Sequence, residues 1–431
     1  MAKPQLPSWF PQLGSQVWIL AFGRFLSQTG TGFTLFYAPI FFVNQIGLSA
    51  TAVGVGLGSG QVSGILGRIL GGSFSDSRFW GRRRTLLLSA IIAAIASFLL
   101  ATANTFTAVV LGNLLMGLGI GLYWPATEAA VSDLTQGEQR QEAFALTRLA
   151  DNLGLQLGII FGGLLIALTG AYRALFVIDG VSFLIFFVVV YYAISETYKP
   201  KTSYEKNSQE ADKILPAATG KSENGWIVAL RDRTLLVYVL VNILFTLYIS
   251  QIQSTMPLYF SNFIPAAASG KGFSTSTITA LFALHTILIV GLQLPIVRAF
   301  RRFSHPQVLS ISACLWAMGF IFIGLTGVAN NANILWAIFG LGILSLATVT
   351  YTPSASSLVA NLAPDSLRGV YLSINSQCWA IGYLIGPPLG GFALDKGVFV
   401  ANSFWLYMAL SVVVALLILQ YLDLMLKNKF E

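Results

Sequence analysis

One stretch of the chain, residues 123–166, occurs a second time 228 positions later, at residues 351–394. Each copy reads as an apolar helix that ends near a proline, a short polar turn with one arginine, and a second apolar helix with glycines four residues apart. An internal repeat of this length in an apolar chain is typical of a membrane transporter built from two similar halves. Residues that correspond in the two copies include Tyr123 and Tyr351, Pro125 and Pro353, Arg140 and Arg368, and Gly158 and Gly386.

The composition is that of a membrane protein. Hydrophobic residues make up 55% of the sequence and charged residues 10%, whereas about a quarter of a soluble domain is charged. The net charge of +8 comes without a basic stripe interleaved with aromatic residues, so we expect no nucleic-acid partner. Cys314 and Cys378 both lie in apolar runs, which argues against a disulfide or a metal pair, and we expect no cofactor. The start of the chain lacks the features of a signal peptide.

Twelve segments are long and apolar enough to cross a bilayer as helices, which takes about 20 residues each. A long polar segment separates the sixth from the seventh. We therefore expect an N-terminal six-helix bundle over residues 1–198, a cytoplasmic linker over 199–225 and a C-terminal six-helix bundle over 226–431. Residues 226–231 are expected to form a short amphipathic helix on the membrane surface. The predicted spans are 17–43, 50–71, 85–104, 106–129, 142–168, 174–196, 234–260, 276–298, 307–327, 333–358, 369–393 and 401–425.

The basic residues predict the orientation. With the N-terminus in the cytoplasm, the outer loops hold only Arg173, Lys271 and Lys396, and most of the 25 Lys and Arg residues lie on the cytoplasmic side. Both termini should then be cytoplasmic, in a multi-pass protein of a plasma or inner membrane. Residues 39–44 in span one correspond to residues 257–262 in span seven, so the two halves run in the same direction, as in a parallel repeat.

Short motifs resemble those of the major facilitator superfamily, over essentially the full chain. Residues 72–76 (Gly-Ser-Phe-Ser-Asp) and 81–84 (Gly-Arg-Arg-Arg) are similar to the family's cytoplasmic loop signature, with two additional residues between them. The antiporter pattern Gly-x-x-x-Gly-Pro-x-x-Gly-Gly is complete at residues 382–391, whereas Ile159 takes the place of the proline in span five. Asn113 stands where the family has an arginine in span four. The resemblance is to the drug:proton antiporter branch, with two of its markers altered.

The resemblance implies secondary active transport of a small solute by alternating access. We favour proton-coupled export of amphiphilic or drug-like compounds, because 31 Phe, 15 Tyr and 9 Trp residues suit an apolar ligand. The alternatives are a proton-coupled sugar or metabolite symporter and a non-transporting membrane sensor. Asp76 and Arg82 to Arg84 could form a charge network with Asp133 that holds the two halves closed on the cytoplasmic side, and the resemblance implies a gating role for Asp76. The gating candidates are Asp76, Arg82, Arg83 and Asp133, although the arginines could also serve only as topology determinants.

An enzyme is not expected. No nucleophile–His–acid arrangement is apparent, since the chain has two histidines without a partner at a suitable spacing. Residues 219–222 (Thr-Gly-Lys-Ser) resemble part of a phosphate loop, but Leu215 replaces the required glycine and no strand precedes it. We expect a monomer in the lipid bilayer whose partners are a small-molecule substrate and protons.

Small residues at four-residue spacing let helices approach closely in lipid, where burial of apolar surface gives no drive between helices. We assign this packing role to two stripes, one in each copy of the repeat. Their members are Gly154, Gly158, Gly162, Gly382, Gly386, Pro387 and Gly390.

Charged residues inside a span are candidates for function because each costs roughly 2.5–3.5 kcal/mol at the bilayer centre. Glu128 and Arg148 flank the turn near residue 138 almost symmetrically, so we expect them to lie at similar depth and to pair. Arg148 begins a polar stripe expected to face the central cavity, with Asp151 at its edge. The substrate-binding and proton-binding candidates are Arg24, Gln28, Glu128, Arg148, Asp151, Asn152, Gln156, Asn375 and Trp379.

Proton coupling requires a carboxylate whose proton affinity is tuned by burial and by a nearby charge. We identify Glu128 and Asp151 as the only well-placed acids of the first half. The pair of Glu128 and Arg148 could equally be a permanent structural contact. His285 in span eight is a possible relay, but a single histidine in a membrane is more often a hydrogen-bonded core residue.

Overall fold

The computed structural model describes residues 13–198, 225–265, 272–364 and 367–430. Among these residues there are helices and no strand. Of the linker predicted at 199–225, residues 199–224, with the fragment at 219–222, lie outside them, and Gly225 begins α8. The helices are α1 (Ser15–Asn44), α2 (Ala50–Ser75), α3 (Gly81–Thr102), α4 (Phe106–Asp133), α5 (Gly137–Thr169), α6 (Tyr172–Ala193), α8 (Gly225–Arg231), α9 (Arg233–Gln253), α10 (Thr255–Asn262), α11 (Thr275–Ala299), the 3-10 turn η1 (Phe300–Arg302), α12 (His305–Val328), α13 (Asn333–Leu362), α14 (Arg368–Asp395) and α15 (Val398–Phe430).

Each of the twelve predicted spans coincides with a helix or a helix pair. In the described part of the chain, nine helices are by length and composition apolar enough to cross a membrane. Helices α1, α2 and α14 are not among these nine. The seventh predicted span is not continuous, because the chain breaks at Ser254 between α9 and α10. Pro257 explains the break, since its ring lacks an N–H and clashes with the carbonyl four residues earlier, at Gln253.

Hydroxyl side chains start several of the helices. Ser49 accepts a hydrogen bond from the backbone N–H of Ala52 at 3.1 Å at the start of α2. Thr105 and Ser274 cap α4 and α11 in the same way. Ser304 forms a capping box with Gln307 at the start of α12. A side-chain oxygen in this position satisfies backbone donors that the first turn leaves free.

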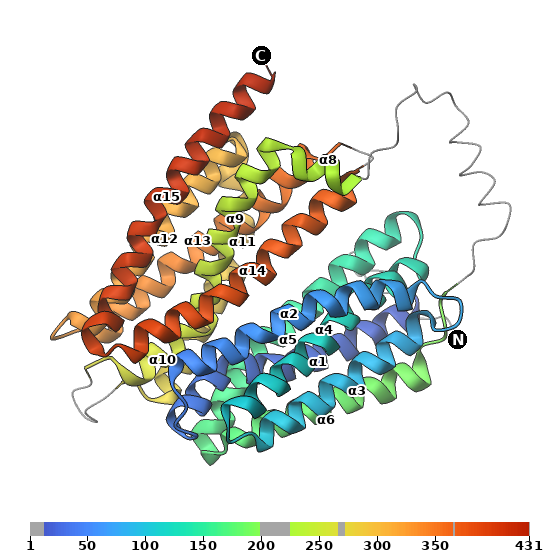
Figure 1. Ribbon diagram of the computed structural model, residues 1–431, viewed down its shortest axis with the longest axis horizontal. Coiled ribbons are helices and arrows are strands. Elements are labelled where there is room, and N and C mark those ends of the chain that lie inside the picture. The colour runs from blue at the N-terminus through green and yellow to red at the C-terminus, as the bar shows by residue number, and fades with distance from the viewer. Residues whose placement is uncertain (1–12, 199–224, 266–271, 365–366, 431) are drawn as a thin grey trace, which may run out of the picture.

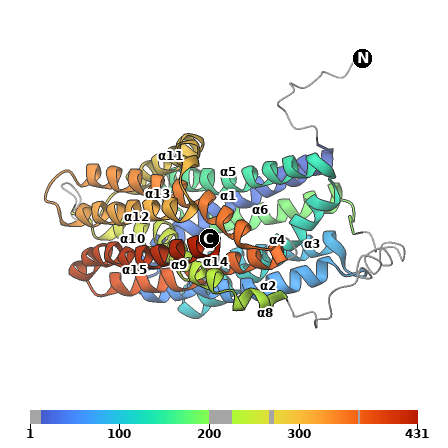
Figure 2. The same ribbon diagram turned by 90° about the horizontal axis from the view of Figure 1, so that it is seen from above.

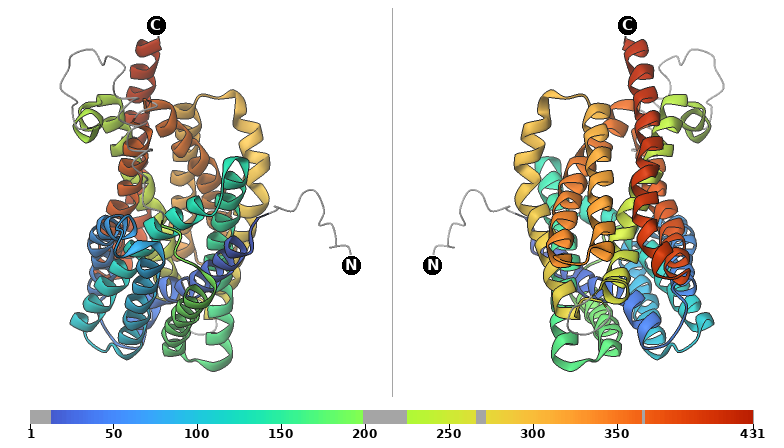
Figure 3. Two further views of the ribbon diagram at one scale, coloured as in Figure 1. Left: turned by 90° about the vertical axis from the view of Figure 1, so that its right-hand side faces the viewer. Right: turned by 90° about the vertical axis from the view of Figure 1, so that its left-hand side faces the viewer.

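The helices form two bundles, α1–α6 and α9–α15, that lie beside each other along the long axis of the molecule (Figures 1 and 2). Helix α2 of the N-terminal bundle packs against α14 of the C-terminal bundle, and α5 packs against α11. The last turns of α15 project beyond the neighbouring helices (Figure 3). The short helix α8, predicted at residues 226–231, leads into α9 and exposes Trp226, Ile227 and Leu230.

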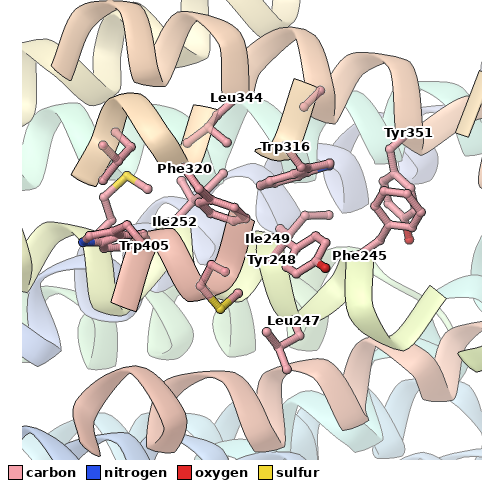
Figure 4. Packing of buried hydrophobic residues seen from close by; sticks show 14 of the residues in the cluster. Phe245, Leu247, Tyr248, Ile249, Ile252, Trp316, Phe320, Leu344, Tyr351 and Trp405 are labelled. Atoms are coloured by element: carbon pink, nitrogen blue, oxygen red, sulfur yellow. The ribbon is translucent and has the colours of Figure 1, made fainter. Parts of the chain in front are cut away.

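Each bundle has its own aromatic and aliphatic core. In the C-terminal bundle, Tyr248 packs against Trp316 with ring centroids 5.7 Å apart, and Phe320 stacks on Trp405 at 6.0 Å (Figure 4). The outer faces of the bundles are apolar as well. On α15 the exposed side chains recur at helical spacing, as expected of a face turned to lipid. They include Leu406, Leu410, Val413 and Leu417.

The bundles meet at one end and diverge at the other. We call the end that carries α10 and the α1–α2 connection the closed end, and the end that carries α8 and the last turn of α15 the open end (Figure 1). At the closed end Asn44 donates a hydrogen bond to Asn262 at 2.9 Å, and Tyr37 and Thr279 share one at 2.9 Å. Nearer the open end, Arg68 of α2 donates a hydrogen bond to Ser376 of α14 at 3.3 Å.

Candidate functional site

A buried ion pair joins α1 to α5. The Nε of Arg24 donates to Oδ1 of Asp151 at 3.0 Å, and its Nη2 contacts Oδ2, so the pair is bidentate. Arg24 is 1% exposed and Asp151 7%. The guanidinium carbon of Arg24 lies 5.7 Å from the ring centre of Tyr123 and 5.4 Å from that of Trp124, both on α4. The fork geometry and the two rings compensate for removing these charges from water.

A second ion pair joins α4 to α5 nearer the open end. Arg148 Nη2 donates to Glu128 Oε1 at 3.0 Å, so the two residues pair as their spacing predicts. Their side chains are 63% and 45% exposed, unlike the buried pair. The guanidinium carbon of Arg148 is 5.8 Å from the ring centre of Trp124. Trp124 is therefore within cation–π distance of Arg24 and of Arg148, and one indole connects the two pairs.

The polar stripe on α5 faces the other bundle. Its third member, Gln156, accepts a hydrogen bond from Thr286 of α11 at 2.6 Å. Asn152 lies one turn and Arg148 two turns nearer the open end on the same face, and both are exposed because the bundles have separated there. Asp151 is turned away into the N-terminal bundle. Gln28 on α1 is half-buried and lines a small cavity with Thr31.

The C-terminal bundle has a neutral polar cluster at the corresponding place. Asn375 accepts hydrogen bonds from Tyr238 and Asn242, each at 2.9 Å. Asn242 in turn accepts from Tyr351 at 2.5 Å. Tyr351 is the repeat counterpart of Tyr123. The offset that relates residues 39–44 of span one to residues 257–262 of span seven makes Asn242 the counterpart of Arg24. The amide oxygen of Asn375 is thus already occupied by two donors within its own bundle.

Trp379, the counterpart of Asp151, belongs to an aromatic contact of α14. Its ring stacks on Tyr383 with centroids 6.2 Å apart. Tyr383 donates to Gln253 at the end of α9 at 2.7 Å. The side chain of Trp379 is half-buried. The structure therefore brings the N-terminal candidates together around Trp124 and leaves Asn375 and Trp379 in separate contacts of the other bundle.

The predicted loop network exists, but it does not connect the two halves. Arg82 pairs with Asp76 at 2.9 Å and with Asp133 at 3.1 Å, and all three residues belong to the N-terminal bundle. Glu196, after α6, accepts from the backbone N–H groups of Arg82 and Arg83. The Arg83 guanidinium donates to a backbone carbonyl of α6 instead of to an acid. In this conformation the network holds α2, α3, α4 and the end of α6 together. It does not reach the C-terminal bundle, because the bundles are apart at the open end.

The glycines of the two stripes pack against helices of their own bundle, whereas Pro387 packs against the other bundle. A Cβ at Gly158 would contact the Thr29 carbonyl and lie 3.2 Å or less from the α1 backbone, and one at Gly154 would contact the Phe25 carbonyl. In α14, Cβ atoms at Gly382, Gly386 and Gly390 would contact Thr246, Ser250 and Thr255 of α9 and α10. Gly162 faces the Tyr37 ring, and the Pro387 carbonyl lies against Gly54 of α2. Contacts this close are what a packing role requires, and that role stays a prediction.

Two acids were missed by the sequence analysis. Asp179 lies in the first third of the predicted sixth span and is completely buried, so Glu128 and Asp151 are not the only buried or in-span acids of the first half. Its signal, a single acid in an apolar run, was present in the sequence. Asp395 ends α14 and contacts the first turn of α2.

His285 is a core residue, 2.6 Å from the Ser345 hydroxyl and 3.2 Å from the Leu341 carbonyl.

Comparisons with known proteins give a family and a fold. The profile described as Major Facilitator Superfamily matches residues 20–264 and 259–428. A "Na(+), Li(+), K(+)/H(+) antiporter" of Planococcus maritimus is 25% identical over 378 residues, covering 85% of this chain and 86% of that protein. "Multidrug resistance protein MdtH" of Photorhabdus laumondii subsp. laumondii is 27% identical over 367 residues, covering 83% and 81%.

Solved structures show the same fold at low identity. A crystal structure of the peptide transporter POT in complex with sulfate matches with a TM-score of 0.75 at 17% identity, covering 96% of each chain. A point mutant of the nucleoside transporter NupG matches with a TM-score of 0.73 at 14% identity, covering 95% of this chain and 100% of that one. The all-helical, two-bundle architecture predicted from the repeat is therefore confirmed.

Proposed function

The chain belongs to the major facilitator superfamily and is a secondary transporter of the membrane, and we propose that it exports amphiphilic cations in exchange for protons. Its relatives are transporters, not enzymes. The single observation that carries the proposal is Trp124, an indole placed between two arginine–carboxylate pairs of which one is buried and one is exposed.

The exposed pair has the chemistry to bind an organic cation. Glu128 supplies a carboxylate, and Trp124 supplies an aromatic face next to it. A cation with an apolar body can replace the Arg148 guanidinium at both groups, since an ammonium and a guanidinium make the same ion-pair and cation–π contacts. A proton on Glu128 would weaken the same contacts. Substrate and proton would then compete for one carboxylate, which is the basis of exchange.

The buried pair has a different role in this proposal. Arg24 and Asp151 are removed from water and hold α1 against α5 beneath the exposed pair. Their charges cancel locally, so Asp151 positions Arg24, and Arg24 in turn supports Trp124. Asn152 and Gln156 complete the polar stripe, and Gln28 lies behind it on α1.

The conformation fits one stage of an alternating-access cycle. The closed end is held by inter-bundle hydrogen bonds, whereas Glu128 and Arg148 are accessible from the open end. By the positive-inside rule, the open end faces the cytoplasm of an inner or plasma membrane, with both termini on that side. This is the state in which an exporter loads its substrate.

A second candidate function is exchange of alkali cations for protons. The observation that favours it is the antiporter of Planococcus maritimus, whose printed name gives Na⁺, Li⁺ and K⁺ as its ions. Glu128 can serve either kind of cation, but Trp124 adds affinity only for an organic one. The sugar or metabolite symporter has no comparable support in the described part of the site.

The experiment is a transport assay in proteoliposomes that hold the purified protein and an internal pH-sensitive dye. An imposed pH gradient is challenged with tetraphenylphosphonium and ethidium, then with NaCl, LiCl and KCl, then with sugars. We expect proton movement triggered by the organic cations. Proton movement with the alkali cations alone would favour the second function. Solute movement without a proton signal would contradict proton coupling.

A further inference from the structure

We propose that Asp179 is a second proton-binding acid and carries its proton in the conformation described here. Its role in transport rests on the proposed proton coupling, but its protonation does not. Asp179 lies on α6, seven residues after the start of the helix, and is 0% exposed. It packs between α1 and α3, away from Trp124 and the two ion pairs.

The hydrogen bonds around the carboxyl group can accommodate a proton. The Ser97 hydroxyl lies 2.7 Å from Asp179 Oδ2 and 3.1 Å from the Ala93 carbonyl. A serine hydroxyl has one hydrogen, so it cannot donate to both oxygens. With a proton on Oδ2, Asp179 donates to Ser97 and Ser97 donates to Ala93, and both hydrogens have an acceptor.

An ionised Asp179 would have only hydroxyl groups to stabilise it, without a charged partner among the described residues. Its Oδ1 is buried and has no hydrogen-bond partner among the residues that the structure describes. Two further hydroxyls nearby direct their hydrogens elsewhere: Ser182 donates to the Asp179 backbone carbonyl at 2.7 Å, and Thr34 donates to the Thr31 carbonyl at 3.2 Å. Burying an ionised carboxylate oxygen without a hydrogen bond destabilises the folded protein strongly. Burying the carbonyl oxygen of a neutral carboxylic acid in the same place costs far less free energy.

Within the described ranges, no charged side chain neutralises Asp179. The other charged residues of α1, α3 and α6 are Arg24, Arg82, Arg83, Arg84 and Arg173, and each contacts a different acceptor. The tyrosine hydroxyl that α1 supplies, on Tyr37, faces α5 and α11. Tyr172 on α6 contacts Thr275 of the other bundle. A proton is therefore the counter-charge that the surroundings allow.

The backbone of α1 closes one side of the carboxyl group. Gly30 lies so close that a Cβ at this position would contact both Asp179 Oδ1 and the Ser182 hydroxyl. This contact favours a proton over an alkali ion, because an ion of that size needs several oxygen ligands around it.

A route for the proton lies beside the carboxyl. Thr34 neighbours Asp179 and also lines a cavity of about 120 Å³ between α1, α2 and α4. Phe176, one turn before Asp179 on α6, forms part of the same wall. A water molecule needs roughly 10–15 Å³ of such space, so the cavity can hold several. Gln61 and Asn113 give these waters polar partners. To pass a proton from them to Asp179, the Thr34 hydroxyl has to turn from the Thr31 carbonyl towards the carboxyl group.

The test is an infrared measurement on the full-length protein in lipid nanodiscs. A protonated carboxylic acid has a carbonyl stretch that a carboxylate lacks, and a buried one retains it at neutral pH. We expect this band in the wild-type protein at pH 7, its loss in Asp179→Asn and its retention in Asp151→Asn. Ser97→Ala removes the acceptor of the acid proton and should shift the band without abolishing it. This variant keeps the test decisive if Asp179→Asn does not fold.

Three results would overturn the proposal. They are the absence of the band in the wild-type protein, its persistence in Asp179→Asn, and its disappearance when NaCl replaces a bulky organic salt, which would make the site a sodium site. The transport assay is read separately. A band assigned to Asp179 without proton-coupled transport would contradict the proposed function alone. Proton-coupled transport without the band would contradict the role of Asp179 alone.

Discussion

Asp395, the last residue of α14, accepts hydrogen bonds from the backbone N–H and the hydroxyl of Thr51, in the first turn of α2, at 2.8 and 2.5 Å. Its other oxygen accepts from the Ala50 N–H at 2.8 Å. A carboxylate of one bundle thus caps a helix of the other at the closed end. An acid in this position is stabilised by the free N–H groups and by the helix dipole.

Asp395→Asn should weaken the closed end. An amide keeps one acceptor oxygen but points an NH₂ group at a backbone donor, so about 1 kcal/mol of inter-bundle stabilisation should be lost, a roughly fivefold shift towards separation. The measurement is the distance between spin labels on Gln45→Cys and Ser276→Cys, in a protein whose exposed Cys314 is replaced by serine. The distance distribution should gain a longer component. Asp423→Asn, an acid near the end of α15, is the control and should leave it unchanged.

Arg148→Ala should abolish substrate-driven proton movement while the protein stays folded, because Glu128 then lacks the counter-charge that takes the place of a departing substrate. The pair with Glu128 is largely exposed, so its loss should cost less than about 1 kcal/mol of stability. Substrate-driven proton movement in proteoliposomes and the thermal unfolding midpoint measure the two effects. Lys427→Ala breaks an exposed ion pair of similar geometry on α15 and should change neither. Normal transport by Arg148→Ala would remove Arg148 from the site.

Arg24→Ala should destabilise the N-terminal bundle. Removing the arginine leaves the Asp151 carboxylate buried without a partner, which costs about 3–5 kcal/mol. The yield of monodisperse protein and its thermal midpoint should both fall. The double variant Arg24→Met with Asp151→Leu removes both charges and should recover most of the stability. If the single variant is as stable as the wild type, the pair is not the structural support we describe.

Gly158→Ala should separate α1 from α5. The new methyl group would meet the Thr29 carbonyl and the Gly32 Cα, which is 3.0 Å from the ideal Cβ position, so the helices must move apart. We expect a lower thermal midpoint and slower transport. Gly291→Ala in α11 is the matched control, because no described atom lies within 4 Å of a Cβ there and alanine is the better helix former. Equal behaviour of the two variants would argue against close packing as the role of Gly158.

The fold was predictable because its signals are local and repeated. Runs of apolar residues located the helices, and the constant offset between the two copies located the bundles. The spacing of Glu128 and Arg148 about a turn was enough to predict their contact, since antiparallel helices place such residues at equal depth. The helix break at Ser254 was harder to predict, because Pro257 ends one helix without lowering the hydropathy of the segment.

The partners of buried charges were harder to predict. Arg24 and Asp151 come from helices far apart in the sequence, and no periodicity of one helix reveals which face meets another. The loop network was predicted to hold the two halves together. In the structure Arg82 pairs instead with two acids of its own bundle, Asp76 and Asp133. Asp179 was missed for a different reason. A buried acid is easiest to recognise beside an arginine, and the described surroundings of Asp179 contain hydroxyl groups instead.

The contact of Gln156 with Thr286 has a mechanical consequence. It joins the two bundles at a point 19 residues from one end of α5 and 13 residues from the other. At 1.5 Å per residue these distances are roughly 29 and 20 Å, so a rigid rotation about the contact moves the two ends by unequal amounts. The arm that carries Arg148 is the longer one. The same angle of rocking would therefore separate the helix ends more widely on the side of the charged pairs than on the side of Asp395.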